Sequence, residues 1–293
     1  MSRGFITLGI DTDLDKIKYS YALALSIKNC DPTAEVCLVV DAGKSDLVSS
    51  KYFSAFDYIT ELPFGNTGHA DGFHGSNMWQ MIHCTPFDET IYVDYDTLFL
   101  NVDIDLLWDQ FENYDLAVTS FARTYKNLPT NKANSFEIEL KYELPLLYNQ
   151  LMYFDSSTDL AQEWFKLADP YFQNWRSVYN TVFTEIKPES FDKNIICNII
   201  TEHLDVTSSI VCNLNNFYDI DTLSQHLWTN DVPKNWTELF NSWFDIENGL
   251  LIENSLIRSG IVHYRDEDFI NEEILNDLRN KFNRTSQSTI EAA

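Results

Sequence analysis

The sequence predicts an α/β protein with a mixed, mostly parallel central sheet flanked by helices. Short apolar runs of strand type alternate along the chain with longer segments whose apolar residues recur at helical spacing. The chain opens with a strand, a helix and a second strand, the pattern of a β–α–β unit. Its composition is that of a globular protein, because 44% of the 293 residues are hydrophobic and only 9 are Gly and 8 are Pro.

The first part of the chain supplies three expected strands. Residues 5–10 are an apolar run typical of a buried strand, residues 14–28 carry apolar side chains at helical spacing, and residues 36–40 are a second apolar run. Residues 41–44 end this run, a polar helix is expected next, and residues 58–62 form a third strand. This alternation predicts a parallel sheet wound with helices.

A glycine-rich loop and a short central strand follow. Four of the nine glycines lie between residues 65 and 75, ahead of the apolar segment 78–84, which indicates a flexible loop before a helix. Residues 91–93 form a short strand that ends at Asp94, and residues 97–100 continue as an extended run. The tripeptide Asp-Tyr-Asp thus lies at the carboxyl end of a strand, where open α/β sheets bind their ligands.

The rest of the chain continues the alternation. A stretch with Trp228, Trp236 and Trp243 precedes the last strand, and large aromatics of this kind pack in cores more often than they stack on sugar rings. Since no internal repeat or clear linker interrupts the chain, residues 1–283 are expected to form one domain, followed by a polar tail at 284–293. We expect strands at residues 116–120, 151–154, 209–214 and 259–263, and helices at residues 159–168, 192–203 and 268–282.

Charge and cysteine content narrow the possible partners and compartment. The formal net charge of −25 repels the phosphates of nucleic acid and of anionic membranes. The five cysteines form no C-x-x-C pair and are odd in number, which favours reduced thiols in the core. No signal-peptide pattern and no apolar stretch of about 18 residues occurs. We therefore expect a soluble cytoplasmic protein without a membrane partner; its oligomeric state is not predicted.

One Asp-x-Asp tripeptide stands out by its context. The chain contains six such tripeptides, but only Asp94 and Asp96 follow one apolar run, IYV, and precede another, TLFL. Two carboxylates at the edge of a buried sheet need a compensating cation, and alternate residues of an extended segment point the same way, with Tyr95 facing elsewhere. Hard oxygen ligands suit Mg²⁺ or Mn²⁺. The alternative is a strand-end turn with two solvated carboxylates.

Four segments carry a resemblance to a known family. ETIYVDYDTLFLNVDIDLLW at residues 89–108 resembles the hydrophobic-Asp-x-Asp-Thr-hydrophobic signature of the glycogenin-like, family 8 type retaining glycosyltransferases. Their fold is called GT-A, a Rossmann-like nucleotide-diphospho-sugar transferase fold. Residues 5–28 resemble the family's opening strand and helix, residues 148–164 its acceptor-side strand and helix, and SGIVHYRD at 259–266 its closing strand with a metal-binding histidine.

The resemblance implies a metal-dependent, retaining transfer of a sugar from a nucleotide diphosphate sugar, expected to be a UDP-sugar, to an unknown acceptor. It implies a nucleotide-sugar-binding half over about residues 1–120 and an acceptor-side half over about residues 121–283. The acceptor is expected to be a saccharide or a protein.

The resemblance also implies roles for particular residues. His263 becomes the third ligand of a Mn²⁺ or Mg²⁺ ion, although a histidine ending an apolar strand is otherwise a core or surface residue. SFDKNIICNII resembles the family's Asp-Gln motif, although a helix N-cap explains its aspartate equally well. The implied set is Asp94, Asp96 and His263 for the metal; Asp192 and Asn149 as catalytic residues beside the transferred sugar; and Thr7, Leu8, Gly9, Asp11, Asp94, Tyr95, Asp96 and Arg265 around the nucleotide.

The chain departs from the family at its basic residues. The family usually carries Lys or Arg near Asn77 and Met78, where GSNMWQM has neither, and its later Gly-x-x-Lys-Pro-Trp stretch is absent after His263. Arg265 is the nearest cation that remains in the matched segments. The resemblance thus predicts a phosphate site that depends mainly on the metal and on backbone N–H groups.

Three other functions stay open at this stage. A sugar-1-phosphate nucleotidyltransferase normally has a Gly-rich, basic loop after the first strand, which GIDTDLDKIK does not supply. The missing basic residue raises the possibility of an inactive nucleotide-sugar-binding module. A glycosyltransferase that acts on modified nucleic-acid bases is disfavoured by the net charge. No dinucleotide-binding, P-loop or G-x-S-x-G motif is present.

Overall fold

A six-stranded sheet forms the centre of the protein in the computed structural model, which describes residues 1–9, 17–68, 74–124, 127, 136–220, 242–253, 256–264 and 269–292. The strand order is β3-β2-β1-β4-β7-β6. The first four strands in this order are parallel, and β7 runs antiparallel to both of its neighbours. The predicted mixed, mostly parallel sheet is confirmed. Its strands are β1 (Arg3–Leu8), β2 (Val36–Val40), β3 (Tyr58–Glu61), β4 (Glu89–Val93), β6 (Leu116–Thr119) and β7 (Tyr148–Asp155).

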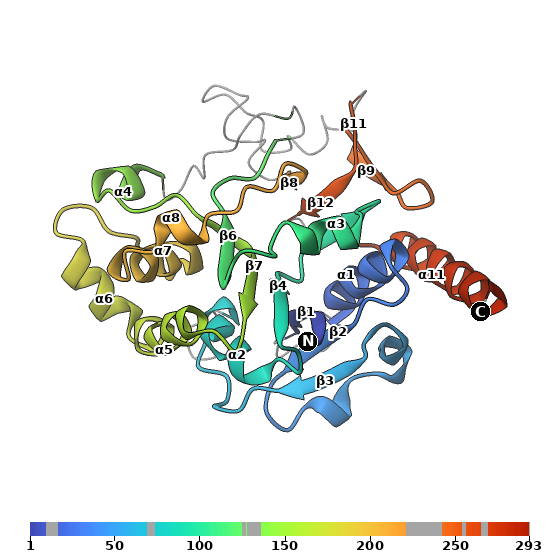
Figure 1. Cartoon of the computed structure of the whole chain (residues 1–293), viewed down its shortest axis with the longest axis horizontal. Helices are drawn as coiled ribbons and strands as arrows, with labels where there is room; N and C mark the ends of the chain where they lie inside the picture. The colour runs from blue at the N-terminus through green and yellow to red at the C-terminus, as the bar shows by residue number, and fades with distance from the viewer. Residues whose placement is uncertain are drawn as a thin grey trace.

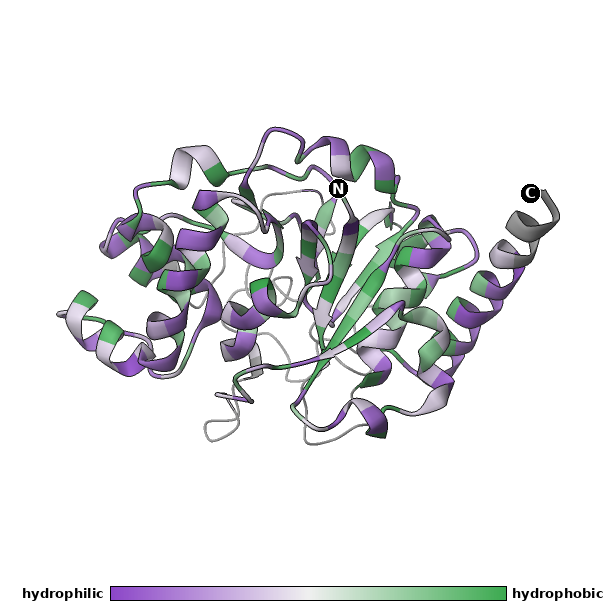
Figure 2. Cartoon of the chain, turned by 60° about the horizontal axis from the view of Figure 1, so that its bottom comes forward, coloured by the Kyte–Doolittle hydropathy of each residue, from purple (hydrophilic) through white to green (hydrophobic). Residues whose placement is uncertain are grey.

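Helices cover both faces of this sheet, and Figure 1 shows α5 and α7 on one side of the central strands and α1 and α11 on the other. Figure 2 shows the hydrophobic strands between helices with hydrophilic outer sides. The helical segments are α1 (Ile17–Cys30), η2 (Ser45–Leu47), η3 (Ser50–Ala55), η5 (His74–Gln80), α2 (Met81–Cys84), α3 (Ile104–Asp109), α4 (Phe136–Lys141), α5 (Asp159–Gln173), α6 (Trp175–Val182), α7 (Lys193–His203), α8 (Thr207–Ile210) and α11 (Glu272–Ala292).

Successive strand residues enter two different hydrophobic cores. Phe5 packs into a core with α1 and α11, whereas Ile6 packs into the other core with α5 and α7. Side chains of a strand alternate between the two faces, so a strand covered on both faces must be apolar throughout. All five residues of β2 are buried for this reason. The continuous apolar runs in the sequence are therefore the signature of a sheet covered on both sides.

Two smaller sheets complete the fold. One has the order β5-β12-β8, formed by β5 (Thr97–Leu100), β12 (Gly260–His263) and β8 (Phe217–Asp219). The other has the order β11-β10-β9, formed by β9 (Ser242–Asp245), β10 (Leu250–Glu253) and β11 (Leu256–Arg258). Because β5 follows β4 after a short bend, the first small sheet brings distant segments to the carboxyl end of β4.

Several boundaries differ from the predictions. The strand expected at 209–214 is wrong: helix α8 occupies its start, and only Val211 forms a bridge, with Val118. Its alternating residues Ile210, Cys212 and Leu214 are indeed buried, but no neighbouring strand extends a ladder along them. The polar helix after the second strand is replaced by the short 3₁₀ helices η2 and η3, and α11 continues past its expected end at residue 282.

The positions of the tryptophans and cysteines test two further predictions from the sequence. Trp243 is 42% exposed in β9, so its assignment to the core is wrong, while Trp228 and Trp236 lie outside the described residues. All five cysteines are free, and four of them are buried. None of the helices in the described part of the chain has both the length and the apolar character needed to cross a membrane.

Candidate metal centre

The centre begins where the chain leaves the main sheet. Strand β4 ends at Val93, and the Asp94 N–H donates to the Gln150 carbonyl at 2.9 Å, which extends the pairing of β4 with β7 by one residue. Residues 94–96 form a bend rather than an extended strand, and β5 begins at Thr97. On the other side, Tyr264 N–H donates to the Asp96 carbonyl at 2.8 Å. Backbone contacts thus hold both aspartates in place.

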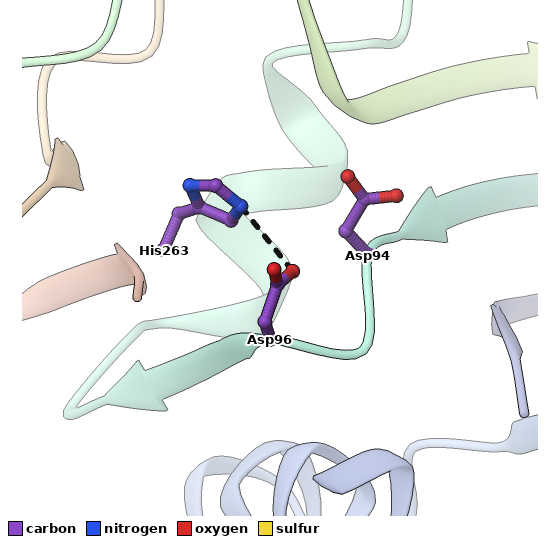
Figure 3. A group of neighbouring side chains, drawn as sticks. All are labelled: Asp94, Asp96 and His263. Atoms are coloured by element: carbon purple, nitrogen blue, oxygen red, sulfur yellow. Dashed lines mark ion pairs between the residues drawn. The ribbon is translucent and has the colours of Figure 1, made fainter. Parts of the chain in front are cut away.

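Asp94, Asp96 and His263 come together at this bend. Each of the three offers one ligand atom, and these atoms lie within 4.8 Å of one another. Figure 3 shows the Asp96 carboxylate directed at the His263 ring, with Asp94 beside them. The distance from His263 Nε2 to Asp96 Oδ1 is 3.2 Å. The antiparallel pairing of β12 with β5 sets His263 opposite Thr97 and so brings it to the tripeptide.

A buried carboxylate and a tyrosine lie behind the histidine. The Nδ1 atom of His263 is 3.8 Å from Asp219 Oδ1 and 3.4 Å from the Tyr148 hydroxyl. Strand register places Asp219, which is fully buried, opposite His263. Burial lowers the pKa of His263, but Asp96 and Asp219 raise it more strongly, to about 10. An imidazole with one nitrogen toward a carboxylate and the other toward a ligand site is the usual arrangement of metal-binding histidines.

The sequence interpretation missed Asp219. The residue belongs to another of the six Asp-x-Asp tripeptides, and the signal available was the pair Phe217-Tyr218 before it, which is too short to predict a strand. Only the pairing of β8 with β12 gives Asp219 its place behind His263.

A lysine occupies the other side of the centre. The ammonium of Lys193 lies 2.6 Å from both carboxylate oxygens of Asp94. The Tyr92 hydroxyl also donates to Asp94 Oδ1, at 2.5 Å. Burial and the neighbouring Asp94 raise the pKa of Tyr92 well above its usual 10, so its proton stays in this hydrogen bond. The sequence interpretation missed this basic side chain, which follows directly after Asp192.

The position expected to carry a basic residue in the family has a different role here. Asn77 is fully buried, and its Oδ1 accepts hydrogen bonds from the Thr67 N–H at 3.0 Å and from Gln80 Nε2 at 3.1 Å. Met78 is fully buried as well. Asn77 thus joins the loop at Thr67 to η5, and Met78 packs into the core on the α5 side of the sheet.

Asp192 and Asn149 meet through the first turn of α7. Asp192 Oδ1 accepts from the backbone N–H groups of Asn194 at 2.8 Å and Ile195 at 3.2 Å, so it is the N-cap of the helix. The Asn149 N–H donates to Asn194 Oδ1 at 3.0 Å, and Asn149 Oδ1 is buried without a hydrogen-bond partner among the described residues. The N-cap interpretation of Asp192 is confirmed, and the contact of both residues with a sugar stays a prediction.

The residues expected around the nucleotide lie at the same sheet edge or outside the described part of the chain. Strands β1 and β4 are parallel neighbours, so Thr7, Leu8 and Gly9 at the end of β1 lie at the same edge as Asp94. Tyr95 is partly buried against the core on the α1 side, with its ring 6.2 Å from that of Tyr19. Asp11 and Arg265 lie outside the described residues.

A large cavity elsewhere has none of the three clustered residues in its wall. It has a volume of about 670 Å³ and lies between α5 and the η5–α2 segment, where Phe64 and Trp79 stack on each other. The chemistry of the clustered side chains, rather than cavity size, identifies the candidate centre.

Comparison with known proteins supports the fold. No protein-family model matches the chain, and no curated protein matches it by sequence. Among solved structures, the galactosyltransferase LgtC in complex with donor and acceptor sugar analogues is 13% identical with a TM-score of 0.52, over 94% of this chain and 95% of that one. The glycosyltransferase GlyE of Streptococcus pneumoniae is 12% identical with a TM-score of 0.51, over 98% of this chain and 64% of that one. The chain thus has the mixed α/β fold of GT-A glycosyltransferases.

Proposed function

We propose that this protein is a metal-dependent glycosyltransferase that moves a sugar from a nucleoside diphosphate sugar to an acceptor. The observation that carries the proposal is the cluster of Asp94, Asp96 and His263 at the carboxyl end of β4. Ligands of open α/β sheets bind at this edge. The likeness to structures of glycosyltransferases, one of them holding donor and acceptor sugar analogues, supports the same reaction class.

The residues of the cluster fit a divalent cation. Two carboxylates and one imidazole suit Mn²⁺ or Mg²⁺, and the imidazole has a carboxylate behind it that orients the ring. In the reaction, such an ion neutralises the negative charge that develops on the departing nucleoside diphosphate. Asp94, Asp96 and His263 would hold the ion, and Thr7, Leu8 and Gly9, at the same edge of the sheet, would contact the nucleotide.

The proposal extends to the sugar and the partners. Asn149 and Asp192 approach the transferred sugar. Asp192 caps α7 directly before Lys193, which contacts Asp94, and Asn149 of β7 contacts the first turn of the same helix. The buried side-chain oxygen Oδ1 of Asn149, which has no hydrogen-bond partner in the described part of the chain, is an acceptor that a sugar hydroxyl or a water molecule can use. We propose a UDP-sugar as donor, a saccharide or protein as acceptor, and retention of configuration at the transferred carbon.

A donor screen with a matched control tests the proposal. The purified chain is incubated with Mn²⁺ and a panel of UDP-sugars, and release of UDP is measured with and without EDTA. We expect UDP release that EDTA stops and that the double substitution Asp94→Asn with Asp96→Asn abolishes. The control is Asp103→Asn with Asp105→Asn, the same change in an exposed tripeptide at the start of α3, where Asn keeps the helix cap.

The possible results separate the functions left open by the sequence. Metal-dependent UDP release that survives the Asp94 and Asp96 substitutions contradicts the proposal. Binding of UDP with Mn²⁺ but no turnover of any donor favours a nucleotide-sugar-binding module. Formation of pyrophosphate from a nucleoside triphosphate and a sugar 1-phosphate indicates a nucleotidyltransferase, and salt-sensitive binding to DNA indicates a base-modifying enzyme.

A further inference from the structure

The two aspartates of the cluster have different ionic partners. Asp96 faces His263, whereas Figure 3 shows Asp94 with no ion pair to either of the other two residues. Asp94 pairs instead with Lys193, whose ammonium is equally close, at 2.6 Å, to both carboxylate oxygens. An ammonium in this position lies on the open side of the carboxylate, where a metal ion would approach both oxygens. Lys193 and a cation therefore compete for Asp94.

The pair is held in a partly buried place. The side chain of Lys193 is 11% exposed and that of Asp94 is 18% exposed. The ammonium lies 5.2 Å from the centre of the Tyr92 ring, and the lysine stem passes Gly75, where an added Cβ would lie 3.7 Å from Lys193 Cδ. Lys193, at the start of α7, thus lies against both β4 and η5. Its ammonium needs a negative partner whenever Asp94 is taken by another cation.

The diphosphate of a nucleotide sugar is the partner of the right charge. A divalent ion on Asp94 repels the ammonium beside it, while the phosphates that accompany the ion attract it. The lysine side chain has a flexible four-carbon stem, so its ammonium can change partners without movement of α7. Asn77 and Met78, where a basic residue was expected, are fully buried and uncharged, so they supply no alternative cation.

We propose that Lys193 is an exchangeable counter-ion: it neutralises Asp94 in the metal-free protein and binds the donor's diphosphate in the loaded protein. This inference rests on the proposed function. The exchange makes binding of the cation and of the nucleotide cooperative. The metal ion on Asp94 releases Lys193 for the diphosphate, and the diphosphate draws Lys193 away from the carboxylate that the metal ion needs. Lys193 is thereby a donor-binding residue, and it also limits the affinity of the centre for the metal alone.

Metal affinity measured with and without nucleotide tests the exchange. The free Mn²⁺ signal in electron paramagnetic resonance gives the Mn²⁺ affinity of the full chain, alone and with UDP, after correction for Mn²⁺ bound by UDP itself. For Lys193→Gln we expect tighter Mn²⁺ binding without UDP, weaker UDP binding at saturating Mn²⁺, and a cooperativity reduced about five- to tenfold. Lys193→Arg keeps the charge and should retain most of the cooperativity.

The control removes the same charge from another ion pair. Lys141 lies in α4 and pairs with Glu185 at 2.6 Å, in a pair whose side chains are 31% and 71% exposed. Lys141→Gln should leave Mn²⁺ and UDP binding as in the unaltered protein. An effect of this substitution equal to that of Lys193→Gln would mean that net charge alone acts, and would overturn the inference.

Two further outcomes separate the inference from the proposed function. Unchanged Mn²⁺ affinity and cooperativity in Lys193→Gln, with Mn²⁺ binding lost in Asp94→Asn, overturn the role of Lys193 and leave the metal centre standing. Absence of Mn²⁺ and UDP binding in the unaltered protein overturns both. If Lys193→Gln does not fold, a crystal structure with Mn²⁺ and UDP decides: Lys193 on the diphosphate supports the exchange, and Lys193 still 2.6 Å from both Asp94 oxygens contradicts it.

Discussion

Asp94 and Asp96 are separated by a single residue, yet the fold surrounds them with different chemistry. Asp96 faces a buried histidine that has Asp219 behind it. Asp94 faces the ammonium of Lys193 and the hydroxyl of Tyr92. Asp96 is thus paired with another member of the candidate ligand set, while Asp94 is neutralised by a lysine outside that set.

The largest effect is expected from His263, the partner of Asp96. Replacing His263 with Gln should abolish Mn²⁺ binding and donor turnover, because it removes a ligand and leaves two carboxylates without their shared partner. Titration with Mn²⁺, followed by electron paramagnetic resonance, measures the loss. His203→Gln at the exposed end of α7 is the control. Normal Mn²⁺ affinity in His263→Gln would show that the histidine is only a core residue.

The next effect concerns the carboxylate behind the histidine. Asp219→Asn preserves the shape of the side chain but removes the charge that orients the imidazole and raises its pKa. We expect Mn²⁺ affinity to fall about 10- to 100-fold, the usual loss when such a supporting group is changed. The same titration measures it. A change smaller than about twofold would mean that strand pairing alone positions His263.

Tyr92, which donates a hydrogen bond to Asp94, should affect stability more than metal binding. Tyr92→Phe removes the hydroxyl that donates to Asp94, and the free energy of unfolding should fall by about 1.5–3 kcal/mol, as for other hydrogen bonds to charged groups. Urea unfolding in the presence of EDTA measures the change. Tyr58→Phe, which removes an exposed hydroxyl beside Glu35, is the matched control with little expected effect. Equal stability of the two variants would contradict this account.

The smallest effect separates two roles of Asp192. Asp192→Ala should lower the free energy of unfolding by about 1 kcal/mol through loss of the helix cap, whereas Asp192→Asn keeps the cap. If Asp192 also contacts the transferred sugar, both variants lose donor turnover. Urea unfolding and UDP release measured on the same samples distinguish the roles. Full turnover in Asp192→Asn would leave capping as the only function of this residue.

Local pattern predicted most of the fold. The continuous apolar runs at 36–40 and 91–93 and the helical spacing at 159–168 correspond to β2, β4 and α5. A strand buried on both faces leaves a continuous apolar run in the sequence, and a helix buried on one face leaves a periodic one. The segment 209–214 shows the limit of these patterns. Its alternate residues are buried, as a strand's would be. A strand also needs a neighbouring strand to pair with along its length, and the local sequence pattern does not predict whether one is present.

The sequence by itself determined the class of fold, the strand before Asp94 and the pair of carboxylates at its end. Resemblance added His263. Only the tertiary structure decided what each carboxylate contacts: Lys193 is 99 residues from Asp94 along the chain, and it reaches the aspartate because α7 begins beside the end of β4. Asp219 likewise meets His263 through the pairing of β8 with β12. Hydrophobic periodicity is a local property, whereas ion pairs between distant segments depend on how the elements pack.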